Sequence, residues 1–406
     1  MGRRAAVVIA GVILGALCSS ARAQGTFTLT YWEANTPTHP LMAEAEQQLW
    51  LQPERPEIVK ALPEGVSGRA SYCVAQVGGR AVPLVLYYSK SPKLFVDTDG
   101  DGDLAEEKPL EASQVKGGSS LDPERLYSFG TFTVQPAAGQ AGPVSCRARL
   151  QDYGSMQLLV LSPAGLVYGK VELGGASYRV ALIDANLDGR YDSVFSLEHR
   201  GDCDRLAIDL NNDRTFDVRA GESQELVPLP RLLQVKDAYY TLQVAADGST
   251  IRFDKTEPRF GTLDLGTPDA TIGLVSDSGP YHFAGGEGKW RVPVGAYSVE
   301  DIVLSRTDEK GARWALKSSG REFGNLARFD IREGETLSLK AGPPLVLKAE
   351  VQQEGRTVGI NFAVFGQAGE GYSPAATRND EEGPPPKLRI LDESGNVLDK
   401  GSFEFG

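Results

Sequence analysis

Short β-prone runs separated by turn residues fill most of this sequence after residue 65. The chain holds 46 glycines and 24 prolines, which break it too often for long helices. Short strands separated by frequent turn residues are typical of antiparallel sandwiches. We therefore predict a mainly β, multi-domain antiparallel protein built from sandwich-type modules. Representative runs are GRAVPLVLYYSK, MQLLVLSP and TLSLKAGPPLVLKAEVQ.

One stretch, PTHPLMAEAEQQLWL over residues 37–51, has the spacing of a helix. Leu41, Ala45 and Leu49 recur at intervals that place them on one helical face, and Thr38 is available as a cap. We therefore expect one short N-terminal helix, within an N-terminal segment that spans residues 24–64.

The first 23 residues have the organisation of an export signal peptide. Arg3 and Arg4 precede an apolar run over residues 5–17, and small residues surround a cleavage position before Gln24. The run is shorter than the roughly 20 residues that a bilayer-spanning helix needs. We expect an exported protein without a transmembrane segment, located in the periplasm, at the cell surface or outside the cell. Lipid attachment at Cys18 stays open, although Leu17 stands where that motif has Gly or Ala.

Composition shifts divide the rest of the chain near Pro258. Before it we expect a β domain over residues 65–258, and after it a β-sandwich module over 259–344 and a small Ig-like β module over 345–406. The run WRVPVGAYSVEDIVL resembles prealbumin-like or carboxypeptidase-regulatory-like modules, which implies a small sandwich there.

The chain is acidic, with 54 Asp and Glu against 42 Lys and Arg. This balance argues against nucleic acid as a partner, since nucleic acid needs a basic footprint, and it is compatible with cation binding. Cys73, Cys146 and Cys203 remain after the signal peptide. A disulfide between Cys73 and Cys146 and three buried free thiols are both open possibilities.

Three segments share one pattern, an apolar run followed by Asp-x-(Asp/Asn)-x-Asp and a turn residue. Calcium takes about 6–8 oxygen ligands, and a tight loop brings the first, third and fifth side chains together around it. The alternative is that Asp, Asn and Gly only form solvated turns. The segments are KLFVDTDGDGDLAEE, VALIDANLDGRYD and RLAIDLNNDRTFD.

In the first segment Gly102 is the turn glycine at the sixth position, and Lys108 stands where an EF-hand has its bidentate glutamate. Glu106 or Glu107 must therefore close the site. The candidate ligands are Asp97, Asp99, Asp101, Asp103 and Glu107.

The second segment has Gly189 at the turn, and the third has Arg214 there. A side chain at positive φ carries a steric cost, so we expect the third site to be weaker or empty. Asp204, just before the third segment, adds charge to it. The candidate ligands are Asp184, Asn186, Asp188, Arg190 (through its carbonyl) and Asp192 in the second segment, and Asp209, Asn211, Asp213 and Asp217 in the third.

These segments resemble the calcium loops of dockerins, thrombospondin repeats and integrin-like propeller blades. The resemblance covers the loops and not whole domains, and it implies Ca²⁺ as the bound ion. A strand-like run, rather than a helix, enters each loop, which favours the versions that are not EF-hands.

Catalytic motifs are missing from the sequence. It contains no HExxH, GxSxG, phosphate loop or dinucleotide fingerprint, and its three histidines have no metal-ligand spacing. Tyr281-His282-Phe283, before the turn AGGEGKW, is a candidate exposed aromatic platform.

The leading hypothesis is an exported calcium-binding protein, a non-enzymatic binding or structural module of the cell envelope, with envelope polysaccharide or a surface protein as its partner. The alternative is a calcium-dependent extracellular hydrolase acting on polysaccharide or peptide. A cleft that holds a carboxylate pair outside the loops would favour the hydrolase. Exposed aromatic side chains would favour a binding module, and a large apolar patch would favour an assembly subunit.

Overall fold

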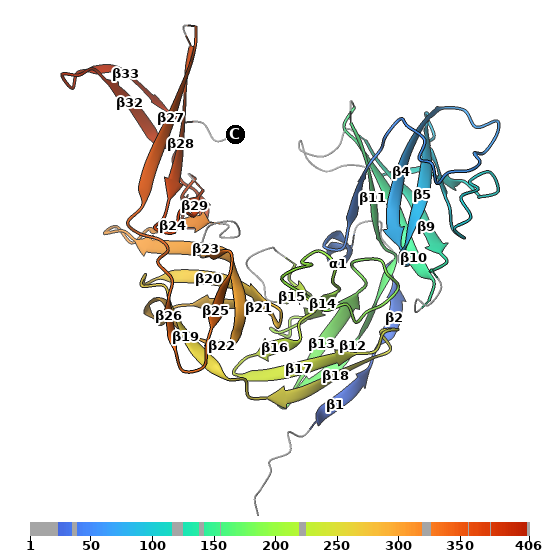
Figure 1. Ribbon diagram of the computed structural model, residues 1–406, viewed down its shortest axis with the longest axis horizontal. Helices are drawn as coiled ribbons and strands as arrows, with labels where there is room; N and C mark the ends of the chain where they lie inside the picture. Colours follow the sequence, from blue (N-terminus) through green and yellow to red (C-terminus); the bar gives the residue numbers. More distant parts are fainter. Residues whose placement is uncertain are drawn as a thin grey trace, which may run out of the picture.

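The computed structural model describes residues 23–34, 39–115, 125–137, 142–154, 156–218, 225–318, 326–355, 357–373 and 375–403 (Figure 1). Strands make up 56% of the chain and helices 2%, which confirms the prediction of a mainly β protein. The expected signal peptide lies outside the described residues except for Ala23, where the first strand begins.

The inserted sandwich, named for its place within another unit, packs a four-stranded sheet (β4-β5-β6-β7) against a five-stranded one (β3-β11-β10-β9-β8). Leu84, Leu86, Leu150 and Leu161 are buried between the two sheets. The opposite face of β5 is covered as well, because Val85 packs in a second apolar cluster. The strands are β3 (Gln47–Trp50), β4 (Arg69–Val77), β5 (Arg80–Tyr88), β6 (Lys93–Val96), β7 (Leu110–Glu111), β8 (Ser113–Val115), β9 (Arg125–Val134), β10 (Val144–Asp152) and β11 (Gln157–Pro163).

The central sandwich packs the sheet β15-β14-β13-β12-β2 against the sheet β1-β18-β17-β16. Two of its strands precede the inserted sandwich in the chain and the others follow it, so the first unit is inserted into the second. Thr28 of β1, for example, pairs with Thr250 of β18. The strands are β1 (Ala23–Thr28), β2 (Thr30–Glu33), β12 (Gly165–Leu173), β13 (Ala176–Ile183), β14 (Arg205–Ile208), β15 (Leu226–Pro228), β16 (Leu232–Val235), β17 (Ala238–Val244) and β18 (Thr250–Thr256).

The C-terminal sandwich packs the sheet β22-β19-β26 against a larger sheet in the order β21-β20-β23-β24-β29-β28-β27. Its first strands are β19 (Phe260–Asp264), β20 (Ala270–Ser276), β21 (Gly279–Ala284), β22 (Lys289–Pro293), β23 (Gly295–Thr307) and β24 (Arg313–Ser318), with the short helix η1 (Gly286–Gly288) before β22. The later strands are β25 (Phe329–Ile331), β26 (Thr336–Ser338), β27 (Val346–Glu354), β28 (Thr357–Phe365), β29 (Gly371–Tyr372), β30 (Thr377–Arg378) and β31 (Glu381–Glu382).

A separate hairpin, β32 (Lys387–Leu391) with β33 (Val397–Ser402), ends the described chain. The three sandwiches follow one another along an open arc in Figure 1, with the inserted sandwich at one end and the hairpin at the other.

Of the helix predicted over residues 37–51, the structure has only α1 (Pro40–Ala43), and the prediction is wrong for residues 44–51. The expected cap, Thr38, lies outside the described residues. Residues 47–50 form β3 instead, where Leu49 pairs with Leu159 of β11. The apparent helical face is divided between two cores. Leu41 and Ala45 pack on the outer face of the central sandwich, whereas Leu49 packs against the core of the inserted one.

Within the described ranges, no helix is long and apolar enough to cross a membrane.

The three cysteines that the structure describes are free thiols, so the disulfide considered between Cys73 and Cys146 is not formed. Both lie in the core of the inserted sandwich, on strands of opposing sheets. Burial raises the pKa of the Cys73 thiol to about 12. A thiol held protonated in this way behaves as a small apolar side chain.

Candidate metal sites

Each Asp-rich loop begins where a buried strand ends. We call residues 97–107, after β6, the first loop, residues 184–192, after β13, the second loop, and residues 209–217, after β14, the third loop. The strand residues before each loop lie in apolar cores, so the aspartate that follows is also buried. The exposed fractions are 1% for Asp97, 4% for Asp184 and 1% for Asp209.

The backbone turns in the same way in all three loops. The residues at the fourth and sixth positions have positive φ, which is unusual for side chains other than glycine. The φ values are 89° and 83° for Gly100 and Gly102, 58° and 82° for Leu187 and Gly189, and 61° and 77° for Asn212 and Arg214.

The hydrogen bonds repeat as well. In every loop the N–H of the sixth residue donates to the carboxylate of the first aspartate, at 3.1 Å from Gly102 to Asp97, 2.9 Å from Gly189 to Asp184 and 3.1 Å from Arg214 to Asp209. The carboxylate at the fifth position accepts from the N–H of the seventh residue, at 2.6 Å for Asp101, 2.8 Å for Asp188 and 2.8 Å for Asp213. Three different sequences thus form one loop template.

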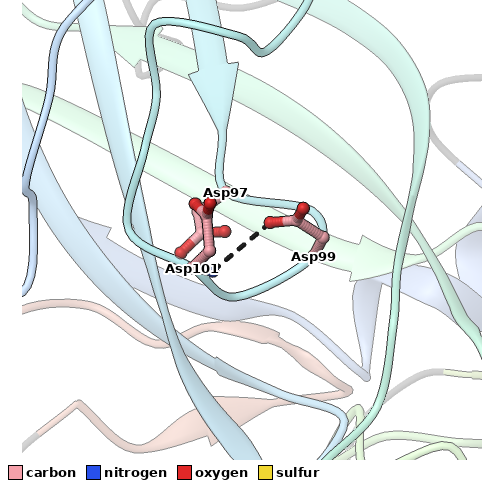
Figure 2. A group of neighbouring side chains, drawn as sticks. All are labelled: Asp97, Asp99 and Asp101. Carbon is pink, nitrogen blue, oxygen red and sulfur yellow. Dashed lines mark hydrogen bonds between the residues drawn. The ribbon is translucent and has the colours of Figure 1, made fainter.

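The first loop brings its acids closest together. Asp97, Asp99 and Asp101 each offer a carboxylate oxygen within 4.8 Å of the others, and they form the one such group among the described residues (Figure 2). The charges of Asp101 and Asp99 raise the pKa of Glu106. The loop therefore concentrates negative charge at one point.

A further carboxylate sits over the N–H of the second residue in each loop. Glu107 accepts from Thr98 at 2.5 Å in the first loop, and Glu225 accepts from Leu210 at 2.9 Å in the third. In the second loop the N–H of Ala185 faces Asp204. We call these three residues the closing carboxylates. Glu107 was predicted as a metal ligand of the first loop, and Glu225, just before β15, was not predicted.

Asp204, which was expected to add charge to the third loop, bonds to Ser193, the residue that follows the second loop. It is fully buried, and its Oδ2 accepts from the N–H of Ser193 at 2.8 Å, whereas its Oδ1 has no hydrogen-bond partner. Burial, followed by the charges of Asp184 and Asp188, raises its pKa to about 9.

The pKa of Asp184 is also raised. Burial, followed by the charge of Asp188, raises its pKa to about 7. The charge of Asp188 acts on both Asp184 and Asp204, so negative charge gathers around these two buried carboxyls. Carboxylates buried together need a proton or a cation to offset their repulsion.

The third loop has a similar buried oxygen, since Oδ1 of Asp209 has no hydrogen-bond partner. Its turn residue is Arg214 at a φ of 77°, which is the strained conformation that the sequence predicts. Asp213 accepts from the Thr215 hydroxyl at 2.6 Å, and this bond holds the pKa of Asp213 below its usual range.

The carboxylates of two residues predicted as ligands accept hydrogen bonds from the protein. Both carboxylate oxygens of Asp192 accept from the guanidinium of Arg190, at 2.9 and 2.8 Å. Asp103 lies outside the group of Asp97, Asp99 and Asp101, and its Oδ1 accepts from the N–H of Ala105 at 2.8 Å.

The groups that converge in the loops fit a hard cation. They are carboxylate and amide oxygens, and two of the buried oxygens have no protein partner. Oxygen donors in this number and of this kind suit calcium, whereas magnesium keeps several waters and uses fewer protein ligands.

A separate cavity of about 430 Å³ lies between the central and C-terminal sandwiches. His282 and Asp301 line this cavity from the two strands on either side of Gly273. Asp301 lies directly against Gly273, because a Cβ there would be 2.4 Å from Asp301 Oδ2.

The expectation of an exposed platform at residues 281–283 fails for Tyr281, which is 5% exposed and stacks on Phe283.

No protein-family model, curated protein or solved structure matches this chain.

Proposed function

We propose that this chain is an exported calcium-binding β protein that acts as a non-enzymatic binding or structural module of the cell envelope. The observation that carries the proposal is the loop template. It occurs three times, each time with a buried first aspartate and a closing carboxylate over the second N–H. Ordinary Asp turns leave their acids in solvent, whereas buried charges are paired or coordinate metals.

The calcium in this proposal is structural. The loops lie at the ends of core strands, so an ion bound there stabilises strands of the inserted and central sandwiches. An ion that binds only the folded state raises its stability according to its concentration relative to Kd, by about 2.7 kcal/mol at 100 Kd. Extracellular calcium modules bind at about 10⁻⁴–10⁻³ M, so even weak loops would be filled outside the cell.

Exposed apolar side chains on the C-terminal strands support a role in contact with a partner. Leu347 and Val351 of β27 are 70% and 64% exposed, and Leu398 of β33 is 67% exposed. Clustered exposed apolar residues mark interaction surfaces more often than scattered ones do. A surface protein or an envelope polysaccharide fits this role in the proposal.

The test is thermal unfolding of the chain from residue 24 in EDTA and then in increasing calcium. We expect calcium to raise the midpoint, and Asp97→Ala and Asp184→Ala each to reduce the rise. Asp392→Ala is the matched control, because Asp392 also begins an Asp turn but lies in the β32–β33 hairpin. A midpoint that calcium does not move, with no metal detected by mass spectrometry, would refute the proposal.

The hydrolase remains the second candidate, and the cavity between the sandwiches supports it. Glu300 and Asp301 both line this cavity, and burial raises the pKa of Asp301. Against it, Glu300 makes an ion pair with Arg200 at 3.3 Å. Calcium-loaded protein should release products from dye-linked polysaccharide or casein if this candidate is correct, and Asp301→Asn should abolish the release.

A further inference from the structure

The second loop is also a contact between sandwiches. Leu187, at its fourth position, is 1% exposed and packs in the core of the inserted sandwich, although the loop follows a strand of the central one. Its carbonyl accepts from the N–H of Gly78 at 2.7 Å. Gly189 passes so close to the inserted sandwich that a Cβ would lie 3.0 Å from the Gly142 carbonyl oxygen. The shape of this loop therefore fixes where the inserted sandwich sits.

Residues 193–203, which we call the clasp segment, leave the second loop and reach the C-terminal sandwich. Phe195 packs in one small cluster with Val275 of β20. The N–H of Leu197 donates to Asp277 Oδ1 at 2.8 Å. The ion pair between Arg200 and Glu300 adds a third contact.

Asp204 holds the base of the clasp segment closed. Its N–H donates to the Ser193 carbonyl at 2.8 Å, and its Oδ2 accepts from the Ser193 N–H at the same distance. The Ser193 hydroxyl donates to Asp188 Oδ2 at 3.1 Å. The two ends of the clasp segment thus meet at the carboxylates of the second loop.

The unpartnered oxygen of Asp204 is the observation that indicates a ligand here. The residue is fully buried, and its Oδ1 has no hydrogen-bond donor even though it lies in a polar site. Its neighbours Asp184 and Asp188 are also carboxyl groups, so negative charge gathers at this site. A cation bound at Asp204 Oδ1 would satisfy an oxygen that the protein leaves unpaired.

We propose that Asp204 completes the calcium site of the second loop from outside that loop, and that the bound ion fixes the inserted and C-terminal sandwiches relative to the central one. The inference rests on the proposed calcium function and adds a ligand and a mechanical role to it. One ion then orders both the loop that enters the inserted core and the clasp segment that reaches the C-terminal sandwich.

The ligand is tested by calcium titration calorimetry on the wild-type chain, on Asp204→Asn and on Asp192→Asn. Asp192→Asn is the matched control, since it removes one charge from the same loop at a carboxylate already bound to Arg190. We expect Asp204→Asn to weaken one site by at least about tenfold, since even outer-shell partners of a metal are worth about 10–100-fold in affinity. We expect Asp192→Asn to bind as the wild type does.

The mechanical role is tested by the distance between two spin labels. Lys90 in the inserted sandwich and Glu309 in the C-terminal sandwich are exposed, so Lys90→Cys with Glu309→Cys accepts the labels while the native thiols stay buried. We expect one narrow distance distribution in calcium, and a broader one in EDTA or when Asp204→Asn is added. Circular dichroism confirms that each variant is folded.

The outcomes separate the two proposals. A wild-type chain that binds no calcium overturns the proposed function itself. Calcium binding that Asp204→Asn leaves unchanged overturns the ligand assignment while the calcium function stands. A label distance that stays the same with and without bound calcium overturns the mechanical role.

Discussion

Two buried carboxylates control how the metal-free protein responds to pH. The pKa of Asp184 is about 7 and that of Asp204 about 9 in the folded protein, against about 3.9 for an unfolded aspartate. The folded state therefore binds more protons than the unfolded state between these values. The stabilising effect of the protons is complete below about pH 4 and is lost as the pH rises through 7 to 9.

In EDTA we therefore expect the free energy of unfolding to fall between pH 5 and pH 9, because the carboxylates lose protons that no cation replaces. Calcium should reduce this fall. Guanidinium denaturation at both pH values measures it, and Asp204→Asn should make the profile flatter. A stability in EDTA that increases with pH, unchanged by Asp204→Asn, would contradict the expectation.

Arg214→Gly is expected to stabilise the third loop. Arg214 has a φ of 77°, and an L-residue in this conformation costs about 1–2 kcal/mol that glycine avoids. The gain should be about 1 kcal/mol, because glycine also loses more entropy on folding. Chemical denaturation in calcium gives the value. Gly102→Ala is the opposite test and should destabilise, since its Cβ would lie 2.5 Å from the Ile58 carbonyl oxygen.

At the scale of elements, the short strand β14 joins two loops. Asp204 immediately precedes this strand and Asp209 immediately follows it, so only the four residues of β14 separate the closing carboxylate of the second loop from the first aspartate of the third. Between these two residues β14 pairs with β13. Ions bound in the two loops would hold the same strand at its two ends.

Asp209→Ala should therefore weaken calcium binding at the second loop as well as remove it from the third. Energetic coupling between sites is typically about 5–150-fold, and we expect the lower end of this range. Calorimetry resolves the effect, with Asp97→Ala as the control because the first loop lies in another sandwich. Equal calcium affinity of the second loop in the wild type and in Asp209→Ala would show that β14 does not couple the two sites.

Local sequence predicts the elements that depend on neighbouring residues. Apolar runs such as β5 and the Asp spacing of the three loops are visible in the chain, and both are present in the structure. Asp204 and Glu225 could not be assigned in this way, because strand pairing and not spacing brings them to their loops. The same cause explains the error at residues 37–51, where two separate cores share one apolar pattern.

At the scale of the whole molecule, the C-terminal residues are tied to the sandwich before them. Val364 and Tyr372 lie in the same core as Leu263 and Tyr297. Glu370 is fully buried and accepts from the N–H of Ala368 at 2.9 Å. The module expected over residues 345–406 thus supplies part of the core of the unit that precedes it.

A chain truncated after residue 344 should lose stability in its C-terminal sandwich, because Tyr372 and Val364 no longer cover the core. Each large buried side chain is worth roughly 1.5–3 kcal/mol, so the combined loss should be several kcal/mol. Differential scanning calorimetry measures it. A chain truncated after residue 386 lacks only the β32–β33 hairpin and serves as the control. Equal midpoints for both truncations would show that residues 345–386 contribute nothing to the core.

Local patterns also do not reveal the insertion of one sandwich into another, because the residues expected as one β domain, 65–258, hold strands of both. The insertion has a consequence for the order of folding. The inserted sandwich is continuous from β3 to β11 and can form as soon as those residues are available. β1 must wait for β18, and contacts so far apart in sequence form slowly because a long loop must close first. We therefore expect β1 to be among the last strands to pair.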